Sequence, residues 1–596
     1  MIVKKRKTGA FLLALFMAAA SVQWCFAEDV EPLCSAPGWV KPDITPTFSE
    51  PGRSPMLRSE PLPSAYGFSI DEGLVPSHQT PVKNQGVNGV CWAFATMAAA
   101  EANLLLGGGE WENPPDLSET HMIYSCSKYG ASANDVSNAE QGYNSRPRDG
   151  GNIYYAAAYL MRGTTLGGTL EEASDPYCYA DKTLPYRAVE TTKALGAERA
   201  YSVENIPIIV GDKDERYDTA SGGFVSETEE IKRAILSYGA VVTSIYWLSS
   251  SDYYNSATGA YYVPAMRDAN HAISIVGWDD TYSASSFRQT PPGDGAWLIK
   301  NSWGTGADAG IDGSGYYWVS YYDGRIGEWT YAIDGVTPFR AETIVHEYDY
   351  RVDGTASGAI SYIIAFPRET ASERLDAVKV LLNSAAELRI GVCPDYTPGL
   401  ADPLTGNHFL AKQTNRIGKP GFYTIPLTEP ELITGDCFAV RLELLSGTPE
   451  LYTYDRASAP RLTAGGAAYD AVLYQRSAGD AWRPLIRSDG NFHTPCIKAV
   501  TTDLSNREML EIEGAAADGD GLQVTVETTM AKTVLLLAAA YRGGRVEACA
   551  ARQVDLHAAR EVFALPPLPA GERYRVFVVD PTTHAPLAAW YEWTHD

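Results

Sequence analysis

The chain has 596 residues, and its 45% hydrophobic and 20% charged content is that of a folded protein large enough for several domains. Its formal net charge of -25 at pH 7 repels phosphate backbones and argues against nucleic acid as a partner. Nine cysteines are too few for a scaffold built on disulfides, so stability must come mainly from apolar cores.

The first 27 residues have the pattern of a secretory signal peptide. Basic residues precede an apolar run, and Cys25-Phe26-Ala27 has the small-x-small form of a cleavage site. The alternative is an uncleaved membrane anchor, but the apolar run is shorter than a full membrane span. We therefore expect an exported protein (periplasmic, cell-surface or extracellular) with no transmembrane anchor after cleavage.

The next part of the chain changes from an irregular segment to a mixed helix and strand pattern. Residues 28–61 are rich in proline and keep no helical or strand period, which predicts a linker or a short pro-segment. An α+β domain is predicted over 62–336. Its helical patterns cover 153–162 and 230–239, and its strand patterns cover 239–247, 271–278 and 295–303.

Beyond about residue 340 the helical periods fade. Short alternating runs recur there between clusters of turn-forming residues, as expected of β-sandwiches. We predict one all-β sandwich over 340–502 and a second over 505–596. The clearest alternating runs are 360–366, 377–383, 388–393, 437–445, 471–476 and 532–556.

Cys91 stands where a glycine-rich loop meets an alanine-rich helix, which is predicted from Cys91 to Leu106 and is ended by glycines at 107–109. The unpaired N-H groups of a helix start favour the thiolate, the form in which cysteine is a nucleophile. The alternative is a core thiol packed beside Trp92 and Phe94, because unpaired cysteines are often buried.

Several segments of the 62–336 domain resemble, in order, those of papain-family cysteine peptidases. They are PVKNQGVNGVCWAF (81–94), DLSETHMIYSC (116–126), DGGNIYYAAAYL (149–160), DANHAISIVGWD (268–279) and AWLIKNSWGTG (296–306). The resemblance implies a papain-like fold, with a helical subdomain and a β-barrel-like subdomain. With the two sandwiches, it makes the fold class multidomain.

The resemblance also implies a catalytic set. His271 would take the proton of the Cys91 thiol, and Asn301 would hold the imidazole ring in orientation. Gln85, with the backbone N-H of Cys91, would bind the developing oxyanion. Trp303 would lie beside the substrate cleft and shield the contact between His271 and Asn301 from water.

Other residues correspond to the cleft wall and to the disulfides of the family. Gly150 and Gly151 match the paired glycines along which a substrate backbone lies. The resemblance implies a disulfide between Cys126 and Cys178, whereas Asn88 takes the position of a cysteine in another bridge of the family. The 28–61 segment is too short for the helical propeptide of many relatives, so a folded prodomain is not expected and the activation route is open.

The β-rich parts resemble modules that follow such peptidases in bacterial proteins. The 340–502 part is similar to a lectin-like sandwich, in which Trp482 and Tyr452 would stack on a sugar or belong to edges and domain contacts. The 505–596 part is similar to an Ig-like or fibronectin-like module with a spacer or docking role.

Together these features predict an exported cysteine endopeptidase that acts through an acyl-enzyme on protein or peptide substrates, without a metal or other cofactor. A glycan or another cell-surface molecule is a candidate ligand of the lectin-like domain. One alternative is a surface adhesin or glycan-binding protein with an inert peptidase domain. Another is a transferase or cell-wall amidase with the same nucleophile chemistry.

Overall fold

The computed structural model describes 38–42, 46 and 61–593, except for 70–74, 109–110, 112, 128–141, 144–148, 164–166, 178–198, 213–216, 219–222, 225–226, 357–358, 447–450, 457–461, 465–466, 470–472, 485–491, 505–509, 519–520, 529–531, 543–544, 558–559, 570–572, 580 and 582–590. The predicted signal peptide, 1–27, and most of the 28–61 segment lie outside these ranges. In the described part, no helix is both long and apolar enough to cross a membrane.

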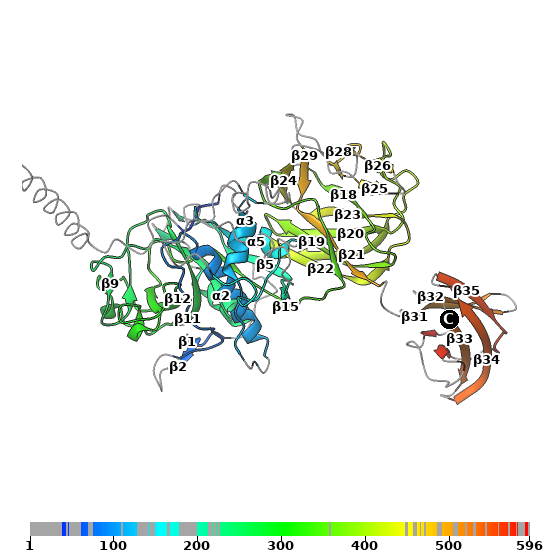
Figure 1. The fold of residues 1–596 in the computed structure, drawn as a ribbon, viewed down its shortest axis with the longest axis horizontal. Coiled ribbons are helices and arrows are strands. Elements are labelled where there is room, and N and C mark those ends of the chain that lie inside the picture. The colour runs from blue at the N-terminus through cyan, green and yellow to red at the C-terminus, as the bar shows by residue number, and fades with distance from the viewer. Residues whose placement is uncertain are drawn as a thin grey trace, which may run out of the picture.

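The first part of the fold contains the principal helices (Figure 1). They are α2 (Cys91–Leu106), α3 (Glu119–Cys126), α5 (Ile153–Met161) and α7 (Thr228–Tyr238). The helix predicted from Cys91 to Leu106 is confirmed, and it ends before Gly108, which has a φ of +76°. The Asn152 side chain caps α5 by accepting a hydrogen bond from the backbone N-H of Tyr154 at 3.0 Å.

An antiparallel arrangement of strands packs against these helices. Its central strands are β5 (Asn205–Val210), β14 (Glu328–Ala332), β8 (Val241–Ile245), β11 (His271–Asp279), β12 (Ala296–Lys300) and β13 (Tyr316–Ser320), in this spatial order. The strand patterns predicted at 239–247, 271–278 and 295–303 are therefore confirmed.

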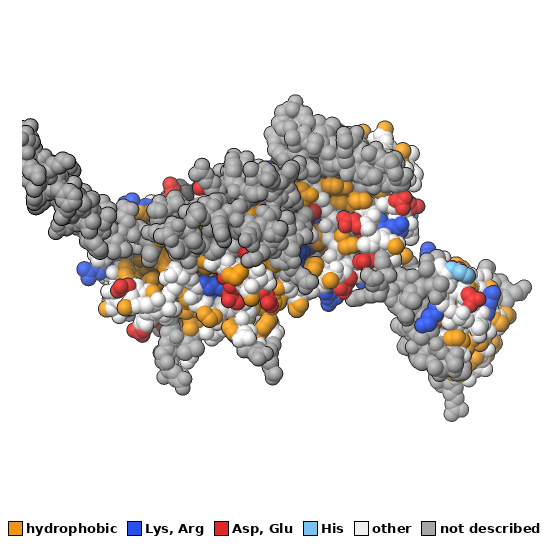
Figure 2. Space-filling model, in the orientation of Figure 1, with side chains coloured by type: hydrophobic (Ala, Val, Ile, Leu, Met, Phe, Trp, Pro, Cys, Tyr) orange, Lys and Arg blue, Asp and Glu red, His pale blue; other side chains and the backbone are white. Residues whose placement is uncertain are grey.

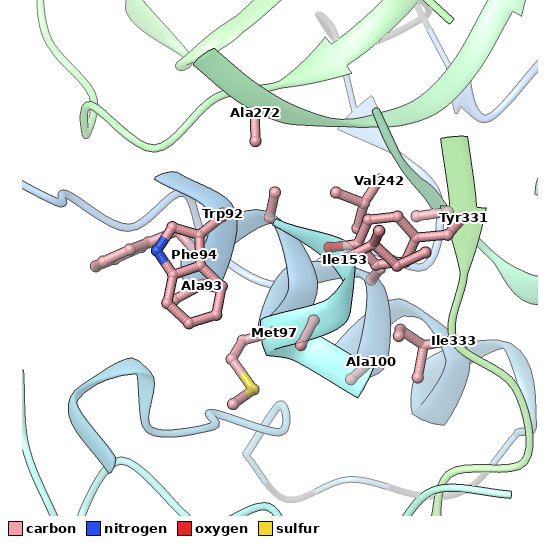
Figure 3. Close-up of a cluster of buried hydrophobic side chains, with 14 of the residues drawn as sticks. Trp92, Ala93, Phe94, Met97, Ala100, Ile153, Val242, Ala272, Tyr331 and Ile333 are labelled. Atoms are coloured by element: carbon pink, nitrogen blue, oxygen red, sulfur yellow. The ribbon is translucent and has the colours of Figure 1, made fainter. Parts of the chain in front are cut away.

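Alternating side chains of β11 serve two cores. Ala272 and Val276 join the core that contains α2, whereas Ile273 and Ile275 join the core that contains α7. Figure 3 shows part of the first core, with Trp92 and Met97 of α2 below Ala272. Packing on both faces of the sheet fixes β11 next to the beginning of α2.

The middle part is a sandwich of two sheets, as the alternating runs predict. One layer is β16 (Thr343–His346), β30 (Ile497–Asp503), β19 (Glu373–Leu382) and β22 (Gly421–Leu432). The other is β21 (Leu410–Ile417), β20 (Ala386–Cys393), β23 (Cys437–Ser446), β18 (Ser361–Pro367), β27 (Leu473–Arg476) and β28 (Arg483–Pro484). Apolar side chains of both layers form one core.

Strand pairing joins this sandwich to the first part of the chain. β5 pairs with β22, and Phe422 lies opposite Ile206 in the register. Both side chains are buried, and Phe422 belongs to the same core as α2. The two predicted domains are therefore connected by a continuous sheet as well as by the chain itself.

The last part is a second sandwich, with sheets of β31 (Leu510–Asp518), β32 (Gly521–Thr528) and β35 (Arg560–Leu565), and of β34 (Arg545–Leu556), β33 (Lys532–Arg542), β36 (Arg573–Val579) and β37 (Tyr591–Trp593). Both sheets contribute to one core. The predicted fold class, an α+β domain followed by two all-β sandwiches, is confirmed.

The remaining elements are short. They are β1 (Ala65–Tyr66), β2 (Phe68–Ser69), β3 (Val75–Pro76), β4 (Tyr201–Ser202), β6 (Tyr217–Asp218), β7 (Gly223–Phe224), β9 (Tyr254–Asn255), β10 (Ala260–Tyr261), β15 (Thr337–Pro338), β17 (Gly354–Ala356), β24 (Leu451–Arg456), β25 (Leu462–Ala464), β26 (Ala467–Tyr469), β29 (Phe492–Pro495), η2 (Ala284–Ser286) and η3 (Ile311–Gly313).

Candidate active site

Cys91 is the first residue of α2, and its side chain is fully buried. The preceding residue, Val90, makes no side-chain cap hydrogen bond, and its carbonyl accepts from the backbone N-H groups of Ala93 and Phe94 at 3.0 and 3.4 Å. The backbone N-H of Ala272 donates a hydrogen bond to the Cys91 sulfur at 3.2 Å. This contact brings the sulfur next to the residue that follows His271.

His271 and Asn301 meet at neighbouring strand ends. His271 opens β11, Asn301 follows β12, and their side chains are joined by a 2.9 Å hydrogen bond between Nε2 and Oδ1. Because an amide oxygen only accepts, Nε2 must carry the proton and Nδ1 is the acceptor nitrogen of the neutral ring. Burial lowers the pKa of His271 to about 4, although the hydrogen bond to Asn301 opposes this shift.

Two tryptophans enclose this pair. The Trp303 ring stacks on His271 with centroids 4.7 Å apart and planes 22° apart. Trp247 meets the Trp303 ring edge-on at 5.1 Å and the His271 ring at 6.3 Å. The aromatic faces exclude water from the bond between His271 and Asn301, so that the bond forms in surroundings of low polarity.

Gln85 is buried and held at both ends of its side chain. Its Nε2 donates to the backbone carbonyl of Asn88 at 2.7 Å, and its Oε1 accepts from the Ser302 hydroxyl at 2.5 Å. Its backbone N-H also donates to the Ser302 carbonyl at 2.8 Å. Gln85 is thus fixed beside the segment that follows Asn301, and Asn88 forms part of that support.

Gly150 and Gly151 precede α5, and Gly151 lies against the indole of Trp92, the residue after Cys91. Gly150 has a φ of +88°, which favours glycine, and a Cβ added at Gly151 would collide with the indole of Trp92. A side chain at Gly150 would strain the backbone, and one at Gly151 would disturb Trp92, the residue after Cys91. The backbone of Gly151 is therefore open to pairing with an extended segment.

That pairing is made by 38–41, a segment that we call the strap. The N-H of Val40 donates to the Gly151 carbonyl at 3.1 Å, and the N-H of Gly151 donates to the Gly38 carbonyl at 3.3 Å. Trp39 thereby forms a parallel bridge with Gly151. On the other side of the strap, the N-H groups of Gly38 and Trp39 donate to the Asn270 carbonyl at 3.1 and 3.3 Å.

The strap lies directly over the thiol. Gly38 is so close that a Cβ added there would collide with the Cys91 sulfur. Trp39 is only 2% exposed and belongs to the core that contains Cys91. Lys41 forms an ion pair of 2.5 Å with Asp212, whose side chain is 4% exposed. Sequence reasoning missed this arrangement, for which the only signal was a tryptophan within an otherwise proline-rich segment.

A buried charge network underlies the end of β12. Lys83 donates to the Glu101 carboxylate at 2.9 Å, and the Thr80 hydroxyl donates to the same carboxylate. Lys300 donates to the Thr80 hydroxyl at 2.8 Å, and burial lowers the pKa of Lys300 to about 8. Since Lys300 precedes Asn301, the network restrains the backbone that carries Asn301. The sequence analysis did not identify these residues as parts of the site.

The candidate disulfide between Cys126 and Cys178 stays a prediction, because Cys178 lies outside the described residues. Cys126 is buried, and its thiol donates a hydrogen bond of 3.3 Å to the Tyr155 carbonyl. Burial raises the pKa of Cys126 to about 12. No disulfide joins two cysteines of the described ranges.

Comparison with known proteins gives the family. Residues 70–326 match the profile described as Papain family cysteine protease. Procathepsin L of Rattus norvegicus is 29% identical over 263 residues, which cover 43% of this chain and 62% of that protein. Cathepsin S of Bos taurus is 28% identical over 226 residues, which cover 38% and 53%. The chain thus spans between half and two thirds of the length of these two relatives.

Two solved structures show the same fold over most of the chain. The cysteine protease and lectin-like domains of Cwp84, a surface layer associated protein of Clostridium difficile, align with a TM-score of 0.57 and 22% identity, over 75% of this chain and 89% of that one. A substituted form of the clostridial cysteine protease Cwp84, after propeptide cleavage, aligns with a TM-score of 0.56 and 22% identity, over 71% and 97%. The peptidase part of this chain, residues 70–326, belongs to the papain family of cysteine proteases.

Proposed function

We propose that the protein is an exported cysteine endopeptidase in which Cys91 is the nucleophile and His271 the general base and acid. The observation that carries the proposal is the convergence of three segments. The Cys91 sulfur accepts a hydrogen bond from the backbone next to His271, and the His271 ring is bonded to Asn301 at 2.9 Å. Family membership supports the same assignment.

The chemistry follows from these positions. The Cys91 sulfur attacks a peptide carbonyl, while its proton moves to Nδ1 of His271, the nitrogen that Asn301 does not occupy. The imidazolium then protonates the leaving amine, and a thioester with Cys91 remains. Water, deprotonated by His271, attacks the thioester and releases the acid, which restores the thiol.

Gln85 and the backbone N-H of Cys91 are proposed as donors to the oxyanion of each tetrahedral intermediate. The hydrogen bonds of Gln85 to Asn88 and Ser302 support this role, because they keep the amide in place before the substrate arrives. Gly150 and Gly151 would align the substrate backbone, and Trp303 would border the cleft. The strap must leave before any substrate can take this position.

The function is tested by incubating the chain that begins at residue 43 with denatured proteins and a peptide library under reducing conditions. Cleavage at internal peptide bonds, identified by mass spectrometry, is expected. Cell-wall peptides, with and without an amine acceptor, form the second arm. Turnover of these substrates alone would favour an amidase or a transferase, and no turnover at all would favour an inert domain.

Export and a place at the cell surface remain part of the proposal. They rest on the signal pattern at 1–27 and on the fold shared with a surface layer associated protein. The lectin-like fold of that structure also supports a ligand-binding role for the 340–502 part. An adhesin without peptidase activity is not favoured, because the complete set of candidate catalytic residues is present.

Replacing Asn301 with alanine is expected to lower kcat/KM by about 100-fold, since the imidazole would lose the bond that fixes its orientation and tautomer. The loss should appear mainly in kcat, and a melting curve should show that the domain still folds. Asn415→Ala, a change on the distant strand β21, is the control and should leave both constants unchanged. Equal kcat values for Asn301→Ala and the parent enzyme would contradict the orienting role.

At acidic pH the strap is expected to bind less tightly over Cys91. In the covered form, burial lowers the pKa of His271 from 6.5 to about 4. The strap bonds to the carbonyl of Asn270, next to His271, and we infer that its removal admits water to the ring and raises the pKa of His271 again. Between these values the open form then binds more protons than the covered form. Acid therefore favours the open form over this range.

The measurement compares two chains, one that starts at residue 28 and one that starts at residue 43. The kcat/KM of the first is divided by that of the second. This ratio is expected to rise at least about 10-fold between pH 6.5 and pH 4.5. Taking a ratio cancels the common pH dependence of the chemical step. A ratio that stays constant over this range would refute the coupling between His271 and the strap.

A further inference from the structure

The outer layer of the middle sandwich carries three arginines around one glutamate. On β23, Val440, Leu442 and Leu444 enter the core, so Arg441 and Glu443 face the opposite way. Arg389 on β20 lies directly opposite Glu443 in the register. Ser361 of β18 pairs with Glu443 on one side and with Arg476 on the other, which puts Arg476 in the same row.

The glutamate contacts all three guanidinium groups. Its carboxylate lies 3.2 Å from Arg389, 3.3 Å from Arg441 and 3.6 Å from Arg476. Among the ion pairs of the described residues, this one negative charge offsets only one of the three positive charges. The cluster therefore keeps an excess of positive charge on a chain whose formal net charge is -25. Figure 2 shows basic and acidic side chains close together in this part of the molecule.

A hollow of about 230 Å³ opens beside the cluster, and we call it the arginine hollow. Its lining consists of Arg389, Gly391, Phe409, Ala411, Arg441 and Glu443. Gly391 lies opposite Arg441 in the register, and a Cβ added there would come within 3.7 Å of the Arg441 Cβ. The hollow thus exists partly because this position has no side chain.

Trp482 orders two of the arginines. The guanidinium carbons of Arg441 and Arg476 lie 5.7 and 5.2 Å from the centre of its ring system. The Nε atoms of both arginines are buried and have no hydrogen-bond partner among the residues that the structure describes. Part of the donor capacity of these groups is therefore unused, although their positions are fixed.

We propose that the arginine hollow binds the carboxylate or phosphate group of an acidic saccharide. Fixed guanidinium groups match both anions in a forked geometry, and partial burial strengthens the attraction. Gly391, Ala411 and Phe409 leave an apolar floor against which the C-H face of a sugar ring fits. Glu443 is placed to accept hydrogen bonds from sugar hydroxyls. This site lies outside the peptidase chemistry and does not depend on it.

The test is calorimetric titration of the whole chain with four ligands. Tetragalacturonate supplies a carboxylated saccharide, glucose 6-phosphate a phosphorylated one, cellotetraose a neutral one and tetraglutamate an acidic peptide. We expect at least one acidic saccharide to bind more tightly than cellotetraose and tetraglutamate. Comparing the two acidic saccharides shows whether the hollow binds a carboxylate or a phosphate more tightly.

Arg441→Gln and Arg389→Gln should each weaken this binding at least about 10-fold, because each removes a charged donor. Gly391→Val should weaken it by filling the hollow. Arg416→Gln is the matched control, since Arg416 lies on β21 with 82% of its side chain exposed and pairs with Glu387. It should change the binding less than 2-fold.

Several results would overturn the proposal. One is that neither acidic saccharide binds, and another is that cellotetraose binds as tightly as the acidic saccharides or tetraglutamate binds more tightly. A third is that Arg416→Gln weakens the binding as much as the variants of the hollow do. Since Arg389 is 49% exposed, its replacement should fold even if that of Arg441 does not. Unchanged binding in Arg389→Gln and Gly391→Val, both with the melting temperature of the parent, would also refute the assignment.

Discussion

Replacing Cys91 with alanine is expected to lower peptide hydrolysis by at least about 10⁴-fold, because the thioester cannot form without the sulfur. The position is fully buried at the start of α2, and alanine fits there without a new polar group. The melting temperature should therefore change little. Initial rates on a fluorogenic peptide and a thermal melt of the same preparation give both values.

Cys549→Ala is the control for this experiment. Cys549 is an exposed cysteine of the terminal sandwich, far from Cys91 in the chain, and its loss should leave the rate unchanged. A Cys91→Ala variant that keeps more than a tenth of the parent rate would contradict the assignment of the nucleophile. If Cys91→Ala does not fold, its loss of activity does not test the nucleophile. Cys91→Ser is therefore made as a second variant, and it too should be inactive.

Removing the strap is expected to raise kcat/KM at least about 100-fold. The chain that begins at residue 43 lacks Gly38 over the sulfur, the buried Trp39 and the ion pair between Lys41 and Asp212. Burying a large apolar side chain contributes about 3 kcal/mol, which corresponds to about 100-fold in the ratio of covered to open enzyme. Steady-state rates of the chains that begin at residues 28 and 43 are compared at pH 6.5.

A point variant separates the strap from the rest of the deleted segment. Trp39→Ala should give a smaller rise than the deletion, because the backbone bonds to Gly151 and Asn270 remain. Trp111→Ala, at a position 37% exposed, is the matched control and should have no effect. Equal kcat/KM values for the two chains would show that the strap does not block the substrate.

Much of the fold follows from periodicity. The alanine-rich run after Cys91 and the glycines behind it predict α2 with its observed ends, because helix formers and glycine stops act locally. The apolar runs at 271–278 and 295–303 form β11 and β12, whose side chains alternate between two cores. These elements could be predicted because the signal lies within each segment.

The candidate site has no signal within any one segment. Cys91, His271 and Asn301 are far apart in the sequence, and only the resemblance of their segments to a family predicts that they meet. The structure brings His271 and Asn301 into a hydrogen bond and puts the backbone beside His271 on the sulfur. Their catalytic roles stay predictions, as do the domain limits and the disulfide of Cys126.

The strap, the pairing of β5 with β22 and the arginine hollow could not be predicted from patterns. Each depends on contacts between distant segments, and such contacts leave no local period. Trp39 reads as an isolated aromatic residue in a proline-rich stretch, and Arg389, Arg441 and Arg476 read as ordinary outward positions of strands. Only the register across β20, β23, β18 and β27 puts these arginines together.

The Cys91 sulfur is expected to form a covalent bond with the carbonyl carbon of the substrate. Mass spectrometry of the chain that begins at residue 43, quenched in acid during turnover of a peptide ester, tests it most directly. One acyl group per chain is expected on the peptide that contains Cys91, and it should appear and decay at the rate of turnover. Full turnover with no acyl group on Cys91, or with the acyl group on another residue, would contradict it.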